Sequence, residues 1–185
     1  MRVISGVHKG RKLTPVPGRQ TRPTTDKVKE ALFQMIGPYF DGGMCFDLFA
    51  GSGGLGIEAL SRGMERAIFV DKQQKAISTI YENLEALRMK DQAEVYRTDA
   101  FRAIKAAGKR GLTFDYIILD PPYDKVKFED LFEAIHEQHL LKSDGMLVCE
   151  HSADQTLPQL IGEYEQIRYE TYSSIISISL FQHQS

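Results

Sequence analysis

Four consecutive residues, Asp120-Pro121-Pro122-Tyr123, could hold an amine for chemical reaction. An apolar run over residues 116–119 precedes them and is typical of a buried strand, so we expect Asp120 where that strand ends. Two prolines stiffen the main chain and remove its N–H groups, which leaves carbonyl oxygens as acceptors. A carboxylate and a fixed carbonyl can receive both hydrogens of an NH₂ group, while Tyr123 stacks on the ring that carries it. The competing interpretation is a capped tight turn with an exposed tyrosine.

The chemistry that this turn favours is group transfer to the exocyclic amine of a nucleobase. Such an amine is a poor nucleophile because its lone pair is delocalised into the ring. Holding both hydrogens favours a geometry in which the lone pair points at the reacting group, so positioning does most of the catalytic work. A base inside a duplex cannot reach such a turn, and the target must therefore be unpaired or flipped out.

A second pattern, Gly51-Ser52-Gly53-Gly54-Leu55-Gly56, has the spacing G-x-G-x-x-G between a strand-like run and a helical pattern. Glycines allow a sharp turn and let a ligand lie against bare main chain, while the N–H groups of a helix start favour negative charge. Asp71 follows 20 residues after Gly51, where a carboxylate can accept from ribose hydroxyls. The pattern predicts a nucleotide-like cofactor, and a tightly packed helix entry without a ligand is the alternative.

Asp47 helps to choose among cofactors, because it lies four residues before the first glycine. A carboxylate at that place would repel a dinucleotide pyrophosphate and suit the ammonium and sulfonium groups of S-adenosylmethionine. The order D-x-F-A-G-S-G resembles the first motif of the seven-strand S-adenosylmethionine-dependent methyltransferases. That resemblance also implies an acid beside the adenine after the third strand, where Asp99 stands, although Asp99 could also cap the following helix.

The elements that must position these residues alternate along the chain. We predict strands over 45–50, 67–70, 93–96, 114–119 and 145–150, with helices over 24–36, 55–62, 77–87, 101–107 and 128–139. Strands that are apolar throughout have both faces covered by helices, which predicts an α/β fold with a doubly wound parallel sheet. After a short helix near 156–161, an antiparallel pair over 164–171 and 174–181 completes seven strands.

The N-terminal residues resemble a more specific group of proteins. Residues 2–6 (RVISG), 10–13 (GRKL) and 22–33 (RPTTDKVKEALF) are similar to the N-terminal signature of the bacterial family that methylates N2 of one guanine in 16S ribosomal RNA. With residues 47–56 and 120–123, the similarity covers the whole chain. It implies a monomeric enzyme that uses S-adenosylmethionine and acts on 16S ribosomal RNA or the assembling small ribosomal subunit. The expected organisation is a basic N-terminal arm or hairpin, 1–23, and a methyltransferase domain, 24–185.

The resemblance also implies roles for single residues. The target base is held by Asp120, Pro121, Pro122 and Tyr123. The cofactor is contacted by Asp47, Phe49, Ala50, Gly51, Ser52, Gly53, Gly56, Asp71, Lys72, Asp99 and Ala100. The RNA is contacted by Arg11, Lys12, Arg22 and Thr24.

Charge supports a nucleic-acid partner. Residues 1–30 contain eight Lys or Arg and two acidic residues, a formal charge of +6 in a chain whose total is −2. Clustered cations gain affinity for phosphates through counterion release, although surface lysines also serve simply to keep a segment solvated.

Other classes of protein are disfavoured. No apolar run is long enough to span a bilayer and no secretory leader opens the chain, so we expect a cytoplasmic protein without a membrane partner. Cys45 and Cys149 each lie in a strand-like run and are expected to be core thiols. His136 and His139 have a spacing that can chelate, but without a third ligand nearby we expect no metal.

Three other functions remain open. An adenine-N6 methyltransferase acting on RNA or DNA would use the same turn, because the turn serves either amine. An NAD-dependent oxidoreductase would share the glycine loop. An RNA-binding assembly factor could keep the cofactor fold without activity.

Overall fold

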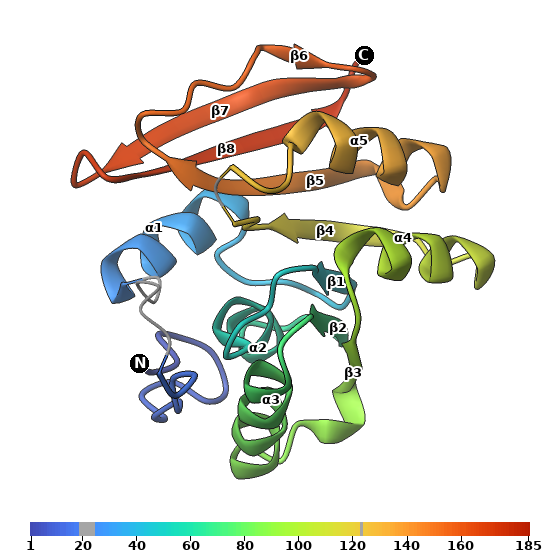
Figure 1. Cartoon of the computed structure of the whole chain (residues 1–185). Coiled ribbons are helices and arrows are strands. Elements are labelled where there is room, and N and C mark those ends of the chain that lie inside the picture. The colour runs from blue at the N-terminus through green and yellow to red at the C-terminus, as the bar shows by residue number, and fades with distance from the viewer. Residues whose placement is uncertain (19–24, 123) are drawn as a thin grey trace. The chain divides into compact units, whose positions relative to one another are not determined.

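The computed structural model describes residues 1–18, 25–122 and 124–185 (Figure 1). The chain divides into two compact units, Met1–Asp99 and Ala100–Ser185. The glycine loop belongs to the first unit and the Asp120 turn to the second.

The first unit is built on three parallel strands in the order β3-β2-β1. Their bounds are β1 Met44–Asp47, β2 Arg66–Asp71 and β3 Ala93–Arg97. Helix α2 (Gly54–Ser61) packs on β1 and β2, and helix α3 (Gln74–Ala86) packs on β2 and β3. A 3₁₀ turn, Lys90–Gln92, leads into β3. Because the strands are parallel, their carboxyl ends lie at one edge, where the loops after β1 and β2 come together.

Helix α1 (Asp26–Ile36) also belongs to this unit. It begins where the hydroxyl of Thr25 accepts from the backbone N–H of Val28 at 3.3 Å, and Asp26 lies in the first turn, where a carboxylate suits the helix dipole. Its buried face carries apolar residues at helical spacing together with one cation, Lys29.

The N-terminal arm, defined here as residues 1–18, contains one antiparallel β-bridge, between Arg2 and Lys12. The N–H of Val3 donates to the carbonyl of Arg11 at 2.9 Å, and the N–H of Gly10 donates back to the carbonyl of Val3 at 2.8 Å. Val3 and Leu13 are buried, so the arm contributes to the core of the first unit.

The second unit contains five strands in the order β4-β5-β8-β7-β6. Strand β4 (Phe114–Leu119) is parallel to β5 (Leu141–Ser152), and the remaining pairs are antiparallel. The others are β6 Leu160–Ile161, β7 Tyr164–Tyr172 and β8 Ile176–His183, of which β7 and β8 form the long hairpin drawn in red in Figure 1. Its helices are α4 (Ala100–Lys109) and α5 (Phe128–Glu137).

An aromatic cluster joins α5 to the antiparallel strands. The ring of Phe132 lies edge-on to those of Tyr164 and Phe181, at centroid distances of 5.5 and 4.9 Å. Burial raises the pKa of Tyr164 to about 12, with a smaller contribution from the charge of Glu163. The tail of the chain is therefore part of the core of this unit.

The α/β fold predicted from the sequence is confirmed, but the predicted helix over 156–161 is wrong. Residues Leu160 and Ile161 instead form β6, paired with Glu165 and Tyr164. Pro158 lacks an N–H and so cannot donate a helical hydrogen bond. Strand β7 offers backbone hydrogen-bond partners to Leu160 and Ile161, which these residues would lack in a short isolated helix. Because β6 is added, the described residues of the two units form three and five strands, eight in total, whereas seven were predicted.

None of the helices in the described ranges is long and apolar enough to cross a membrane.

Candidate functional site

The loop between β1 and α2 turns sharply because of its glycines. Gly51 has φ +58° and Gly53, the residue that caps α2, has φ +85°. L-residues rarely adopt this left-handed conformation, whereas glycine does so without a Cβ clash. The predicted loop between a strand and a helix is therefore present with the expected backbone.

Gly56 allows α2 to approach β2 closely. A Cβ at this position would lie 2.3 Å from Cε1 of the Phe69 ring, which is fully buried in β2. In the G-x-G-x-x-G pattern the third glycine has this packing role.

Two buried carboxylates bind the main chain of the loop. Asp47 Oδ2 accepts from the N–H of Gly56 at 3.1 Å, and Asp71 Oδ2 accepts from the N–H of Gly51 at 2.9 Å. The other oxygen of Asp71 accepts from the N–H of Gln73 at 3.0 Å. Two N–H groups that could bind a phosphate are thus already bonded to carboxylates, and the charge beside the loop is negative. This arrangement suits a cationic ligand group better than a pyrophosphate.

The remaining predicted cofactor residues lie on the same segments or next to them. Ala50 is buried and its N–H donates to the carbonyl of Val70 at 2.9 Å, which joins the ends of β1 and β2. Phe49, Ser52 and Asp99 are half-buried and Lys72 is exposed, while Ala100 begins α4 in the second unit.

The end of β3 is tied to the segment after β2. The N–H of Thr98 donates to the carbonyl of Asp71 at 3.1 Å. Asp99 is the next residue in the chain, so its backbone begins beside this hydrogen bond. Arg97, which the sequence analysis did not single out, donates through Nε to the carbonyl of Lys72 at 3.3 Å. The three acids of the first unit, Asp47, Asp71 and Asp99, therefore follow or end neighbouring parallel strands.

In the second unit, β4 ends at Leu119 and the predicted turn follows it. Asp120 is half-buried, Pro121 is buried and Pro122 is exposed, while Tyr123 lies outside the described residues. The carbonyl of Pro122 accepts from the N–H of Lys125 at 3.4 Å, and Asp124 has φ +68°.

A cavity of about 590 Å³ opens beside this turn. Its lining combines Pro121 and Pro122 with the beginning of α5 and the loop after β5: Asp124, Val126, Lys127, Phe128, Glu129, Ser152, Asp154 and Gln155. The residues of the loop after β5 were not predicted from the sequence. The feature that could have indicated these residues is the parallel pairing of β4 and β5, in which Leu119 is opposite Cys149. This pairing places the segments that follow both strands at the same edge of the sheet.

His151, the residue of β5 that precedes Ser152 of the cavity lining, is fully buried. Its Nδ1 bonds the carbonyl of Ser152 at 3.0 Å, so Nδ1 carries the proton and Nε2 accepts from the hydroxyl of Ser179 at 2.8 Å. Burial lowers the pKa of this histidine, and the hydrogen bonds to backbone carbonyls oppose that shift. A neutral ring therefore anchors the residues that line the cavity.

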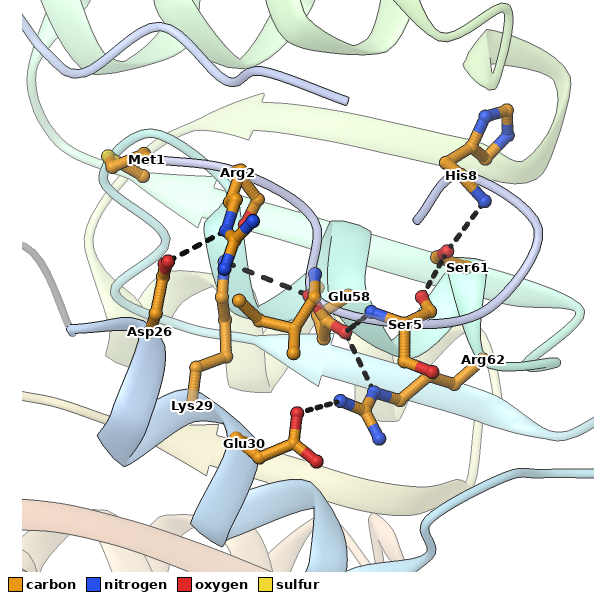
Figure 2. A network of polar contacts seen from close by, with 12 residues as sticks. Met1, Arg2, Ser5, His8, Asp26, Lys29, Glu30, Glu58, Ser61 and Arg62 are labelled. Carbon is orange, nitrogen blue, oxygen red and sulfur yellow. Dashed lines mark hydrogen bonds and ion pairs between the residues drawn. The ribbon is translucent and has the colours of Figure 1, made fainter. Parts of the chain in front are cut away.

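Figure 2 shows that some of the N-terminal cations bind other groups of the protein. Lys29 is buried, lies 3.7 Å from Glu58 and donates to the carbonyl of Arg2 at 2.6 Å, while the Arg2 side chain pairs with Asp26 at 2.8 Å. Burial lowers the pKa of Lys29, which the charge of Glu58 partly opposes.

Of the four residues predicted to contact RNA, two are described. Lys12 is exposed, and Arg11 is exposed but donates to the carbonyl of Ala86 at 3.0 Å. Arg22 and Thr24 lie outside the described residues. The cations that remain for a phosphate backbone are therefore fewer than the formal charge of the segment suggests.

Comparison with known proteins identifies the family. Residues 1–181 match the family model described as Conserved hypothetical protein 95. The chain belongs to this family. The putative rRNA methyltransferase YlbH of Bacillus subtilis is 56% identical over 172 residues, which is 93% of this chain and 94% of that protein. The ribosomal RNA small subunit methyltransferase D of Haemophilus influenzae is 33% identical, over 99% of this chain and 94% of that protein. The predicted resemblance to this bacterial family is thereby confirmed.

Solved structures agree with this assignment. A putative methyltransferase from Escherichia coli, yhhF, superimposes with a TM-score of 0.85 and 27% identity, covering 100% of this chain and 98% of that one. A conserved hypothetical protein from Streptococcus pyogenes has a TM-score of 0.80 at 38% identity, covering 85% of this chain and 96% of that one. A putative methyltransferase crystallised with SAH, SMU.776, shares the fold at 15% identity and a TM-score of 0.67, covering 84% of this chain and 48% of that one. The methyltransferase type of α/β fold is thus confirmed.

The thiols of the chain are ordinary core groups. Cys45 and Cys149 are buried thiols that are not joined in a disulfide, as predicted, and burial raises the pKa of the Cys149 thiol well above its usual value. Within residues 1–18, 25–122 and 124–185, no group of three or more His, Cys, Asp or Glu is placed to hold a metal ion.

Proposed function

We propose that this protein transfers a methyl group from S-adenosylmethionine to the exocyclic N2 of a guanine in 16S ribosomal RNA of the small subunit. The observation that carries the proposal is the position of the Asp-Pro-Pro segment, residues 120–122: it follows the parallel strand β4, and its two prolines line a cavity of about 590 Å³. The names of the relatives support a ribosomal RNA substrate, and the choice of guanine N2 rests on the resemblance of the N-terminal residues.

The loop of the first unit fits S-adenosylmethionine better than a dinucleotide. Asp47 and Asp71 bring two negative charges to the loop and bind the N–H groups of Gly56 and Gly51. A pyrophosphate would be repelled by these charges, whereas a ligand with ammonium and sulfonium groups would be attracted. When bound, S-adenosylmethionine supplies an electrophilic methyl group.

In this proposal the carboxylate of Asp120 and a carbonyl oxygen of the Asp-Pro-Pro main chain each accept a hydrogen bond from one N–H of the target amine. They orient its lone pair and stabilise the positive charge that develops on nitrogen. Tyr123 stacks on the base. The cavity residues Lys127 and Gln155 offer further polar groups to the same nucleotide.

The proposed cofactor contacts are the eleven residues predicted from the sequence, with Asp71 accepting from the ribose hydroxyls and Asp99 beside the adenine. The proposed RNA contacts are Arg11, Lys12, Arg22 and Thr24. The protein works as a monomer in the cytoplasm, and its partner is 16S ribosomal RNA or the assembling small subunit.

Transfer of label from radioactive S-adenosylmethionine tests this function. The purified protein is incubated in parallel with undermethylated small subunits, with naked 16S RNA and with duplex DNA, and the labelled nucleoside is identified by mass. We expect N2-methylguanosine in the ribosomal samples. N6-methyladenosine would instead establish the adenine-N6 alternative.

Ligand-induced stabilisation tests the cofactor separately. S-adenosylhomocysteine should raise the unfolding temperature and NAD should not, because only a ligand that binds the folded state stabilises it. The opposite result would support an oxidoreductase. Binding of cofactor and RNA without any transfer would support an inactive assembly factor.

A further inference from the structure

The side chain of Asn83 on α3 bonds both the N-terminal arm and the glycine loop. Its Oδ1 accepts from the N–H of Thr14 at 2.8 Å, and its Nδ2 donates to the carbonyl of Thr14 at 3.0 Å. The same Nδ2 donates to the carbonyl of Ser52, also at 3.0 Å. Asn83 is 2% exposed, so its two amide hydrogens and its oxygen are all used inside the protein.

These bonds join segments that are remote in sequence. Thr14 is 69 residues from Asn83, and Ser52 is 31 residues from it. Toward Thr14, the amide of Asn83 imitates a backbone peptide, since it both accepts from and donates to one residue. Moving either segment would leave a buried N–H or carbonyl without its partner, which is unfavourable.

The arm also rests on the helix that begins at the glycine loop (Figure 2). Glu58 of α2 accepts from the N–H groups of Ile4 and Ser5 at 2.9 and 3.1 Å. Ser61, one turn further, donates to the carbonyl of Ser5 at 2.7 Å. A Cβ added to Gly54 would lie 3.3 Å from Cε of Met1, so the first residue of the chain reaches the loop itself.

The carboxylate of Glu58 cannot shift easily, because it is fully buried between two cations. Arg62 donates to it through Nε at 2.7 Å, and Lys29 of α1 lies at 3.7 Å. Hydrogen bonds and ion pairs of Glu58, Ser61 and Arg62 therefore hold the arm and α1 against the C-terminal half of α2, and Asn83 connects the arm to Ser52 in the loop.

We propose that Asn83 is a positioning residue that couples the N-terminal arm to the cofactor loop. RNA bound to the arm and cofactor bound to the loop then favour the same arrangement of Thr14 and Ser52, and each ligand increases the affinity for the other. The proposal rests on the proposed function in taking the glycine loop as the cofactor site and the arm as an RNA contact. Couplings of this kind amount to about fivefold or more in affinity.

The variant Asn83→Asp tests the coupling with almost no change of shape. It keeps an acceptor for the N–H of Thr14 but replaces the NH₂ group, which supplies both N–H donors, by one carboxylate oxygen that faces the carbonyls of Thr14 and Ser52. We expect the Kd for S-adenosylhomocysteine, measured by calorimetry, to rise about tenfold. The KM for S-adenosylmethionine should rise with it, whereas kcat at saturating cofactor should change less than twofold.

Glu82→Ala is the matched control. Glu82 is the neighbouring residue of α3 and accepts from the hydroxyl of the same Thr14 at 3.3 Å, but it is exposed and has no bond to the loop. Its cofactor affinity should equal that of the wild type. Undermethylated small subunits should tighten S-adenosylhomocysteine binding by about fivefold in the wild type and in Glu82→Ala, and by less than twofold in Asn83→Asp.

A measurement on the wild type does not depend on the folding of any variant. The N–H of Thr14 donates to Asn83, which in turn donates to the carbonyl of Ser52 in the loop, so S-adenosylhomocysteine should slow the hydrogen exchange of this N–H. Unchanged exchange at Thr14, or an Asn83→Asp variant with wild-type cofactor affinity and coupling, would overturn the inference. A wild type that binds no S-adenosylhomocysteine would overturn the proposed function as well.

Discussion

At the scale of single residues, the acids beside the glycine loop have two tasks. The sequence predicted Asp47 for the charge that it brings to a ligand and Asp71 as an acceptor for ribose hydroxyls, and the structure adds that each binds a backbone N–H of the loop. Replacing either acid would therefore change the loop conformation together with the charge. A loss of cofactor affinity in such variants cannot be assigned to charge alone.

Gly56 permits a cleaner prediction, because its role is steric. Gly56→Ala places a methyl group 2.3 Å from a carbon of the Phe69 ring, so α2 or the ring must shift. We expect the free energy of unfolding to fall by about 1–3 kcal/mol. That corresponds to a drop in unfolding temperature of about 2–4 °C per kcal/mol for a chain of this size.

Gly54→Ala is the control for that measurement. A Cβ at Gly54, which lies on the same helix, would be 3.3 Å from the flexible end of Met1 and 3.7 Å, an ordinary van der Waals distance, from Oγ of Ser52. An equal loss of stability in both variants would show that the loop is sensitive to any added methyl group, and would contradict the special role of the contact with Phe69.

Asp120 is the residue on which the proposed chemistry depends most directly. Asp120→Ala removes the carboxylate acceptor but leaves the glycine loop, which belongs to the other unit, unchanged. We expect kcat to fall by about 100-fold or more, as when a group that stabilises developing charge is removed. The Kd for S-adenosylhomocysteine should stay within twofold of the wild type, and unchanged turnover would remove Asp120 from the mechanism.

At the scale of elements, β5 connects the core of the second unit to the cavity. His151 is anchored by Ser179 of β8, which also accepts from the amide of Gln166 on β7 at 3.0 Å. The residues that follow His151 line the cavity beside Pro121. The antiparallel strands thus support the loop that faces the proposed target nucleotide.

This arrangement predicts a dependence of stability on pH. Burial lowers the pKa of His151 in the folded protein below 6.5, so below that pH the unfolded chain binds more protons. The stability contributed by the neutral ring is full above pH 6.5 and is lost as the pH falls through the lower folded-state pKa. Urea midpoints measured from about pH 7.5 to about pH 5.5 should fall more steeply for the wild type than for His151→Gln. Identical slopes would show that the protonation of His151 does not differ between the folded and unfolded states.

At the scale of the whole molecule, charge is distributed unevenly between a basic N-terminal segment and an acidic remainder. The structure reduces the number of cations available to RNA, since Lys29 is buried beside Glu58. Arg11 donates a hydrogen bond to a carbonyl at the end of α3, so a substitution that reverses the charge of Arg11 would also disturb the fold. Lys12 is the better probe of RNA contact, because it is exposed.

We therefore expect Lys12→Glu to weaken binding to undermethylated small subunits and to lower the slope of log affinity against log salt by about one. The affinity for S-adenosylhomocysteine without RNA should not change. Lys90→Glu serves as the control, since Lys90 is exposed and lies outside the arm. Binding that is independent of salt in the wild type would contradict the phosphate contact.

Local sequence patterns were enough to predict most of the elements. Strand β4 has the predicted bounds, and α1, α2 and α5 end within a few residues of those expected, because burial on one or both faces leaves a regular apolar pattern. The glycine loop and the Asp-Pro-Pro turn were also recognisable, since their backbone needs particular residues at adjacent positions. The predicted helix at 156–161 failed because its residues pair with β7 instead, which a local pattern does not reveal.

Only the tertiary structure decided which remote residues support these motifs. From the sequence, Asn83 is one polar residue of a helix and Lys29 is one more cation among the basic first 30 residues. In the fold Asn83 binds Thr14 and Ser52, and Lys29 is buried beside Glu58. The sequence determined the kinds of chemistry available, since motif residues act through their neighbours in the chain. The choice of partners for the other polar groups required the fold, because a buried amide or ammonium group must bond whatever the packing of distant segments brings within reach.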